Sequence, residues 1–153
     1  MTFSKVRFFG LLILFMAQSI GAFSSETFKE AWVLSYCRSA DTFEEMRGLF
    51  AQGDVTAARM HYRVKVVAGE CTDYTRYGFV VSFKGERIAA RYESPAQGKT
   101  IVIEGRIVNA DNSNGEKAFV WVAAAHIANF LESLDGKPVF QPIAPEFKGW
   151  QDT

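Results

Sequence analysis

The chain has few of the residues that build metal and redox sites. Its 153 residues include only two cysteines and two histidines, and neither a Cys-x-x-Cys nor a Gly-x-Ser-x-Gly motif occurs. Zinc sites and thioredoxin-like sites need such residues at close spacing, and the serine motif marks many hydrolases. We therefore expect no metal and no cofactor, and the sequence offers no catalytic residue.

An excess of positive charge is also missing. Lys and Arg together number 17, as do Asp and Glu, while 22% of the residues are charged and 48% are hydrophobic. Domains that bind nucleic acids are usually strongly basic, because much of their affinity comes from neutralising phosphates. The composition predicts a globular domain that does not bind nucleic acid.

Long apolar runs are absent except near the start of the chain. Residues 8–17 form an apolar stretch of 10 residues, well below the roughly 20 residues that cross a bilayer core. Lys5 and Arg7 precede this stretch and the small residues Gly21 and Ala22 follow it, as in a secretory signal peptide. We expect cleavage after Ala22, with Gly21 as the second choice; an uncleaved membrane anchor is the alternative.

The expected removal of residues 1–22 as a signal peptide predicts that the rest of the chain folds outside the cytoplasm. The remaining chain carries 15 basic and 17 acidic residues and no further long apolar run. A periplasmic or secreted protein is expected, with no membrane contact once the signal peptide is gone.

Cys37 and Cys71 are predicted to form a disulfide bond. Both follow the signal peptide, and an oxidising compartment lets such a bond persist. Closing a loop of this length stabilises a small domain by about 3–4 kcal/mol in the chain-entropy model. A reactive thiol pair is the alternative, but no neighbouring residue pattern supports it.

The pattern of residues 23–71 predicts helices. Ser24 or Ser25 can cap a first helix that carries Phe28 and Trp32 one turn apart. The pair Asp41 and Glu44 resembles a capping box at the start of a second helix, which Gly53 ends.

Residues 54–68 fit either a helix or a strand. Asp54 is a suitable cap and Gly69 a suitable end for a third helix. However, Met60, Tyr62, Val64 and Val66 also alternate with polar residues, as in a half-buried strand. Helix is the preferred interpretation.

From residue 72 to residue 136 the pattern changes to short antiparallel strands. Lys84-Gly85-Glu86 and residues 109–115 are expected to be turns, and 119–122, apolar on both faces, a central strand. The expected strands cover residues 77–83, 88–92, 101–107 and 119–122. Residues 123–134 are expected to begin as strand and finish as a short helix, and prolines make residues 137–153 an edge strand followed by an extended tail. Together these elements predict a small, strongly bent sheet that closes toward a barrel.

Cys37, the helical stretch after it and Gly69-Glu70-Cys71 before the strands resemble a group of small exported bacterial proteins of unknown function. The similarity covers roughly residues 37–125, and the barrel of that group resembles Src-homology-three-like domains. Residues 98–108 followed by 119–122 are also similar to the central strands of an OB-fold. The expected fold class is therefore α+β, with N-terminal helices linked by the disulfide to a small antiparallel barrel, Src-homology-three-like first and OB-like second.

In both families the barrel mostly serves as a binding platform, so the resemblance implies a non-catalytic binding module for a peptide, glycan or protein partner. Residues on the expected sheet that could form such a surface are the aromatic Tyr77, Tyr92 and Trp121 and the basic Arg87 and Arg91. An ordinary solvated sheet face is the alternative for these residues.

Two other functions remain open on the sequence. A small secreted inhibitor or effector would use an exposed loop such as residues 109–115. A small hydrolase would need His61 or His126 in a cleft beside a carboxylate or a serine, which the sequence alone cannot place.

Overall fold

The computed structural model describes residues 26–95 and 97–139. The expected signal peptide and residues 140–153 of the expected tail lie outside these ranges. The described elements in chain order are β1 (Thr27–Phe28), β2 (Glu30–Val33), β3 (Ser35–Cys37), α1 (Asp41–Ala51), α2 (Val55–Val67), β4 (Cys71–Asp73), β5 (Val81–Ser94), β6 (Gly98–Val108), β7 (Asn114–Ala123), the 3-10 helix η1 (Ala124–Asn129), β8 (Leu131–Leu134) and β9 (Lys137–Pro138).

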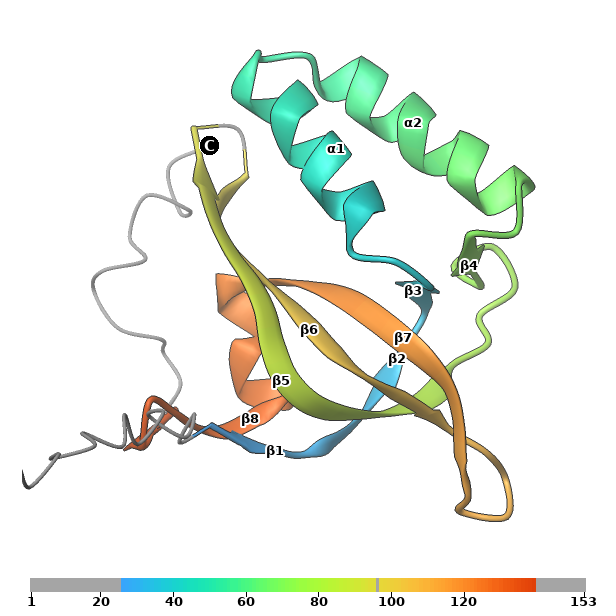
Figure 1. Cartoon of the computed structure of the whole chain (residues 1–153), viewed down its shortest axis with the longest axis vertical. Helices are drawn as coiled ribbons and strands as arrows, with labels where there is room; N and C mark the ends of the chain where they lie inside the picture. Colours follow the sequence, from blue (N-terminus) through green and yellow to red (C-terminus); the bar gives the residue numbers. More distant parts are fainter. Residues whose placement is uncertain (1–25, 96, 140–153) are drawn as a thin grey trace, which may run out of the picture.

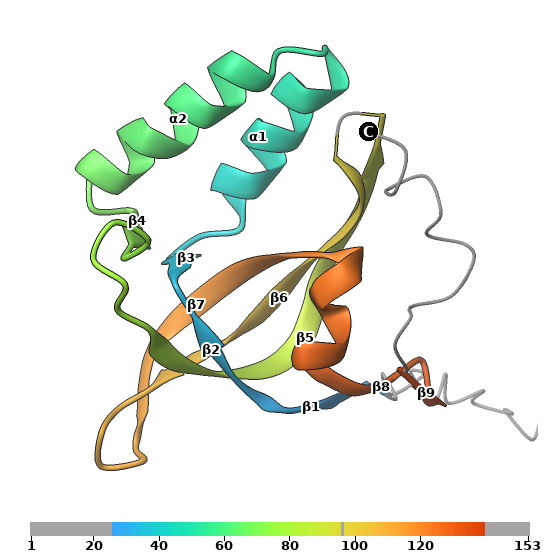
Figure 2. The same ribbon diagram turned by 180° about the vertical axis from the view of Figure 1, so that it is seen from behind.

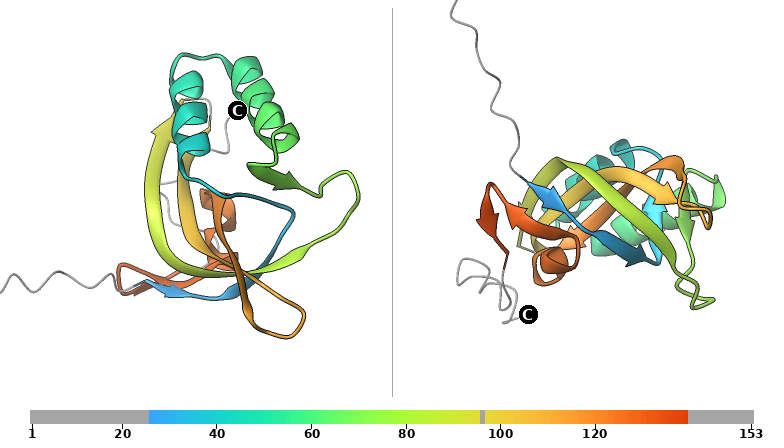
Figure 3. Two further views of the ribbon diagram at one scale, coloured as in Figure 1. Left: turned by 45° about the vertical axis from the view of Figure 1, so that its right-hand side comes forward. Right: turned by 90° about the horizontal axis from the view of Figure 1, so that it is seen from below.

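The fold is mostly antiparallel β-structure. Six strands form one sheet in the order β2-β5-β6-β7-β3-β4, and β1, β8 and β9 form a small second sheet. The long strands β5, β6 and β7 curl into half a barrel, and the small sheet crosses the end opposite the helices (Figures 1 and 3). The expected small barrel is thus confirmed as a strongly bent sheet, with two short helices and a disulfide bond.

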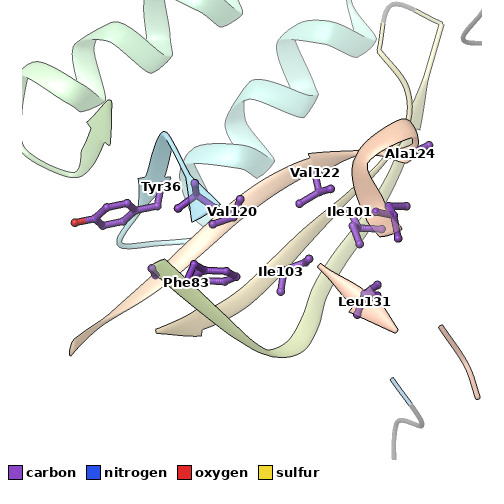
Figure 4. Packing of buried hydrophobic residues seen from close by; sticks show 11 residues of the cluster. Tyr36, Phe83, Ile101, Ile103, Val120, Val122, Ala124 and Leu131 are labelled. Carbon is purple, nitrogen blue, oxygen red and sulfur yellow. The ribbon is translucent and has the colours of Figure 1, made fainter. Parts of the chain in front are cut away.

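The two faces of the curled sheet pack against different partners. Alternate residues of β6 and β7, such as Ile103 and Val120, lie on the core side together with Phe83 and Leu131 (Figure 4). Val102, Phe119 and Trp121 belong instead to a second cluster with Phe43 of α1 and the two cysteines. This division follows from the two-residue period of a strand, which sends neighbouring side chains to opposite faces.

The helices α1 and α2 form a hairpin inserted between β3 and β4 (Figure 1). Cys37 and Cys71 lie opposite each other on these strands and form the expected disulfide bond. Beside the disulfide bond, the Arg38 guanidinium donates hydrogen bonds to the Gly69 carbonyl at 2.6 Å and to both carboxylate oxygens of Glu116 on β7. The hairpin is therefore fixed to the sheet at both of its ends.

The helix predicted around Phe28 and Trp32 is wrong, because residues 27–37 form β1, β2 and β3. Along β2, Ala31 and Val33 are buried whereas Glu30 and Trp32 are exposed. The four-residue spacing of Phe28 and Trp32 fits a strand as well as a helix, and pairing with β5 decides between them. Helical structure begins only at Asp41, and the sheet includes strands from outside residues 72–136.

The turn predicted at Lys84-Gly85-Glu86 is also wrong. Strand β5 runs without interruption from Val81 to Ser94, with irregular register around residues 85–90. A Cβ atom on Gly85 would lie 2.4 Å from the Phe28 ring, so this glycine makes room for a side chain of β1 rather than turning the chain. The chain instead reverses between β5, which ends at Ser94, and β6, which begins at Gly98.

The preferred helical interpretation of residues 54–68 is confirmed. The Asp54 carboxylate caps α2 by accepting a hydrogen bond from the Ala57 N–H at 2.8 Å, and Gly69 follows the helix with a φ of +75°. The capping box predicted at α1 is wrong, because the Ser39 hydroxyl accepts from the Asp41 N–H and Glu44 pairs with Arg47.

The last part of the described chain closes the core. Ala123 ends β7 and is followed by the short helix η1, as predicted, but residues 131–134 then form strand β8 where the helix was expected to finish (Figure 2). Asp135 and Gly136 both have positive φ and turn the chain into β9, which pairs with β8 as the expected edge strand. None of the helices within residues 26–95 and 97–139 is long and apolar enough to cross a membrane.

Candidate functional site

Tyr92 and Trp121 lie together beneath α1. Their ring centroids are 5.7 Å apart, and the Trp121 ring also contacts Phe43 at 5.5 Å and Phe50 at 5.9 Å, both edge to face. Strand register brings them together, since Ala90, Val102 and Trp121 form one row across β5, β6 and β7, and Tyr92 starts the next row. Two of the aromatic residues selected from the sequence thus share a site, but α1 covers it.

The Tyr92 hydroxyl is held between the helix and the sheet. Burial, together with the hydrogen bond to the Glu44 carboxylate, raises the pKa of Tyr92 to about 12. Arg47, which forms an ion pair with Glu44 at 2.5 Å, lies over the Tyr92 ring at 5.6 Å. Tyr92 therefore fastens α1 to β5, a role that the sequence does not reveal.

We predict that Tyr92 ionises only at strongly alkaline pH and that the fold loses stability as it does so. The folded pKa of about 12 lies above the usual value of 10.0, so the contribution of neutral Tyr92 is complete below pH 10 and is lost between pH 10 and 12. Absorbance titration of tyrosinate and urea unfolding at several pH values measure the two effects. In Tyr92→Phe, the part of the tyrosinate absorbance change that occurs at the highest pH should become smaller, and the free energy of unfolding should fall less steeply between pH 10 and 12. An unchanged absorbance titration would contradict the raised pKa of Tyr92.

A cavity of about 300 Å³ lies between the helical hairpin and the sheet. Trp121 forms part of its wall, and Met46, Gln97 and Trp121 keep part of their surface in solvent. The lining residues are Ser35, Tyr36, Phe43, Met46, Phe50, Tyr62, Gln97, Thr100, Trp121 and Ala123. This set is predominantly apolar and contains no Asp, Glu, Lys, Arg or His.

Arg87 and Arg91 are both engaged in ion pairs. Arg87 contacts Glu104, a largely buried carboxylate that Lys117 reaches from the other side at 2.7 Å. Arg91 bridges Glu26 at 3.0 Å and Asp135 at 3.2 Å, and it lines a second cavity of about 260 Å³ on the side of η1 and β8. The two arginines connect elements of the fold, and neither borders the cavity beneath α1.

Tyr77 lies apart from Tyr92 and Trp121, in the loop between β4 and β5. Its ring stacks on Phe79 with centroids 6.4 Å apart, and both rings are mostly in solvent, at 71% and 65% exposure. The loop begins where the Tyr74 N–H donates to the Leu34 carbonyl and ends where Val81 pairs with Val33.

Neighbouring residues extend this exposed apolar surface. Trp32, 71% exposed, and Leu34 lie on the outward face of β2 and the connection that follows it. The register Val33↔Val81 places Val80 opposite Leu34, so these exposed side chains come from two adjoining segments of the chain, residues 32–34 and 77–80. We call Trp32, Leu34, Tyr77, Phe79 and Val80 the aromatic patch.

The two histidines lie away from both cavities. His61 on α2 contacts Glu45 on α1 at 2.5 Å across the helical hairpin, and His126 is exposed on η1. Neither residue lines either cavity, and the cavity beneath α1 has no carboxylate. Within the described parts of the chain, no group of three or more His, Cys, Asp or Glu side chains is arranged to hold a metal ion.

Sequence reasoning did not identify Trp32, Phe79 or Thr100. The sequence pattern places Trp32 in a helix and Phe79 in a strand at residues 77–83, whereas Trp32 lies on β2 and β5 begins only at Val81. No protein-family model, curated protein or solved structure matches this chain.

Proposed function

We propose that this protein is an exported, non-catalytic binding module that holds a peptide or protein segment on the aromatic patch. One observation carries the proposal: five large apolar side chains from two adjoining segments of the chain, residues 32–34 and 77–80, are each 41% or more exposed. Large contiguous apolar patches are uncommon on monomeric proteins and mark interaction sites. Aromatic side chains are enriched at the centres of protein interfaces.

The patch fits a partner that offers apolar side chains. Tyr77 and Phe79 form a stacked pair, and Trp32 extends the surface onto an edge strand of the six-stranded sheet. Large rings bury much area with little loss of side-chain freedom. A glycan could also stack on these rings, and the recovered partner distinguishes the two.

The disulfide bond supports an oxidising compartment outside the cytoplasm. Together with the signal peptide expected at residues 1–22, it supports a periplasmic or secreted protein. The bent sheet is compatible with the Src-homology-three-like relationship inferred from the sequence, with the OB-like one as second choice. Both relationships agree with a binding platform.

An inhibitor or effector is the second function, and the loop after β6 favours it. The Asn109 N–H donates to the Ser113 carbonyl at 2.9 Å, and the Asn109 side-chain amide donates to the Ser113 hydroxyl at 2.9 Å. The Ser113 N–H in turn donates to the Asp111 carboxylate at 2.9 Å. These bonds hold an exposed loop in one conformation, as a protruding inhibitory loop requires.

We predict that Tyr77→Ser/Phe79→Ser abolishes partner recovery without unfolding the protein. The mature chain is immobilised and exposed to an extracytoplasmic extract, and bound material is identified by mass spectrometry. Met60→Ser/Val64→Ser is the matched control, because these α2 side chains are similarly exposed, at 60% and 62%. Exposed substitutions of this kind change stability by about 0.5 kcal/mol or less.

Retention of the same partners by wild type and control, with loss in the patch variant, would support the proposal. Equal retention by all three proteins would contradict it. Turnover of a simple ester or glycan that disappears in His126→Ala would replace the binding module by a hydrolase, and loss of the partner only when residues 109–113 are replaced would favour the inhibitor.

A further inference from the structure

We propose that the cavity beneath α1 is a second binding site, separate from the aromatic patch, for a small uncharged molecule with an apolar body and one hydrogen-bonding group. The cavity lies between Phe43, Met46 and Phe50 of α1 and Thr100 and Trp121 of the sheet. None of the five residues of the aromatic patch lines it.

The shape of the site is already formed. Edge-to-face contacts fix Trp121 against Phe43 and Phe50, and the disulfide fixes the end of the helical hairpin nearest β3. A cavity of about 300 Å³ lies at the lower end of the range for ligand sites and has room for about ten water-sized groups. The space suits a medium-chain or single-ring molecule.

The polarity of the ligand follows from Thr100. This residue is only 3% exposed, and its hydroxyl has no hydrogen-bond partner within the described structure. A buried hydroxyl without a partner costs free energy, so proteins rarely keep one unless a ligand or water completes it. Thr100 on β6 lines this cavity and also the second cavity, of about 260 Å³, on the side of η1 and β8. Ala123 lines only the cavity beneath α1, so a substitution there distinguishes the two.

A second hydroxyl supports the same conclusion. The Tyr62 hydroxyl on α2 is buried, and it makes no hydrogen bond of good geometry although Ser35 lies near it. A tyrosine hydroxyl is uncharged at neutral pH, and burial raises the pKa of Tyr62 above its ordinary value, so this group is a neutral hydrogen-bond donor. Tyr62 and Ser35 both line the cavity, which places hydrogen-bonding groups on two of its walls.

The absence of charge in the wall excludes an ionised ligand head. No Asp, Glu, Lys, Arg or His is among the lining residues, and the nearby Glu44 and Arg47 neutralise each other. A charge moved into such surroundings without a partner would lose its hydration with little compensation. The site therefore favours an alcohol, amide or carbonyl group over a carboxylate.

The test uses 1-octanol as the neutral probe and octanoate as its charged counterpart. In a Trp32→Phe/Trp150→Phe background, Trp121 is the remaining indole of the three in the chain, so its fluorescence reports on the cavity wall. We expect a saturable fluorescence change with octanol and at least a tenfold weaker response to octanoate.

Two substitutions locate the binding. Thr100→Val keeps the shape but removes the hydroxyl, and we expect octanol affinity to fall about 2- to 12-fold, the range of one neutral hydrogen bond, while Thr100→Ser retains affinity. Ala123→Leu fills the cavity and should abolish binding. Ala125→Leu, at an exposed position two residues further along the chain that does not line the cavity, is the matched control and should bind normally.

Four results would overturn the site: no saturable response to octanol, equal affinity for octanoate, unchanged affinity in Thr100→Val, or unchanged affinity in Ala123→Leu with its thermal midpoint retained. Tyr77→Ser/Phe79→Ser should leave octanol binding intact. This last variant separates the cavity from the aromatic patch, so either site can fail without the other.

Discussion

Replacing Cys37 and Cys71 by alanine together is expected to lower the free energy of unfolding by about 3–4 kcal/mol. The disulfide joins residues separated by 34 positions, and a crosslink over such a loop removes much of the freedom of the unfolded chain. Both cysteines are buried in the cluster that packs the helices on the sheet, so a loosened hairpin would also expose apolar surface. For a small domain this is a large share of total stability.

Urea unfolding followed by circular dichroism measures the loss. Wild type treated with a reductant should unfold at nearly the same urea concentration as Cys37→Ala/Cys71→Ala, whereas the variant itself should not respond to reductant. A reductant that leaves the wild-type midpoint unchanged would show that the crosslink contributes little.

Gly105→Ala is the second substitution with a large expected effect. A Cβ at this position would lie 2.1 Å from the Lys84 carbonyl oxygen and 2.8 Å from both the Gly85 Cα and the Phe83 ring. Backbone atoms of a paired strand cannot move aside as a flexible side chain can. We expect a loss of about 3 kcal/mol or more, the upper end of the usual range for overpacking.

Gly48→Ala is the matched control in α1. A Cβ there meets nothing within 4 Å, and alanine is favoured over glycine inside a helix. This variant should gain about 0.5–1 kcal/mol. Thermal and urea unfolding of both variants test the pair, and a Gly105→Ala protein as stable as wild type would mean that β5 and β6 do not approach so closely.

Sequence patterns that involve only a few adjacent residues correctly predicted the helix α2 and the strand β6. Asp54 and Gly69 mark the ends of α2, and the alternation around Ile101 and Ile103 predicts β6, because each signal depends on a few adjacent residues. The N-terminal strands escaped prediction since β2 depends on pairing with β5, some fifty residues away. The turn predicted at Gly85 is wrong for the same reason, because the Phe28 ring that needs the space beside this glycine comes from a distant strand.

The sequence identifies candidate binding residues by their chemical type, but it does not show whether each side chain is exposed, covered or engaged in an ion pair. Tyr92 and Trp121 do meet, yet α1 covers them, and Arg87 and Arg91 are engaged with carboxylates from other elements. Exposure of Trp32 and Phe79 and the unsatisfied hydroxyl of Thr100 arise from packing of remote segments. No pattern of neighbouring residues encodes these properties.

The position of the disulfide has one more consequence. Because Cys37 and Cys71 stand on paired strands at the two ends of the helical hairpin, the intervening chain is a covalently closed ring attached to the sheet. A proteolytic cut between α1 and α2 would therefore leave one molecule instead of two fragments. Both severed helices would remain tethered to the same corner of the barrel.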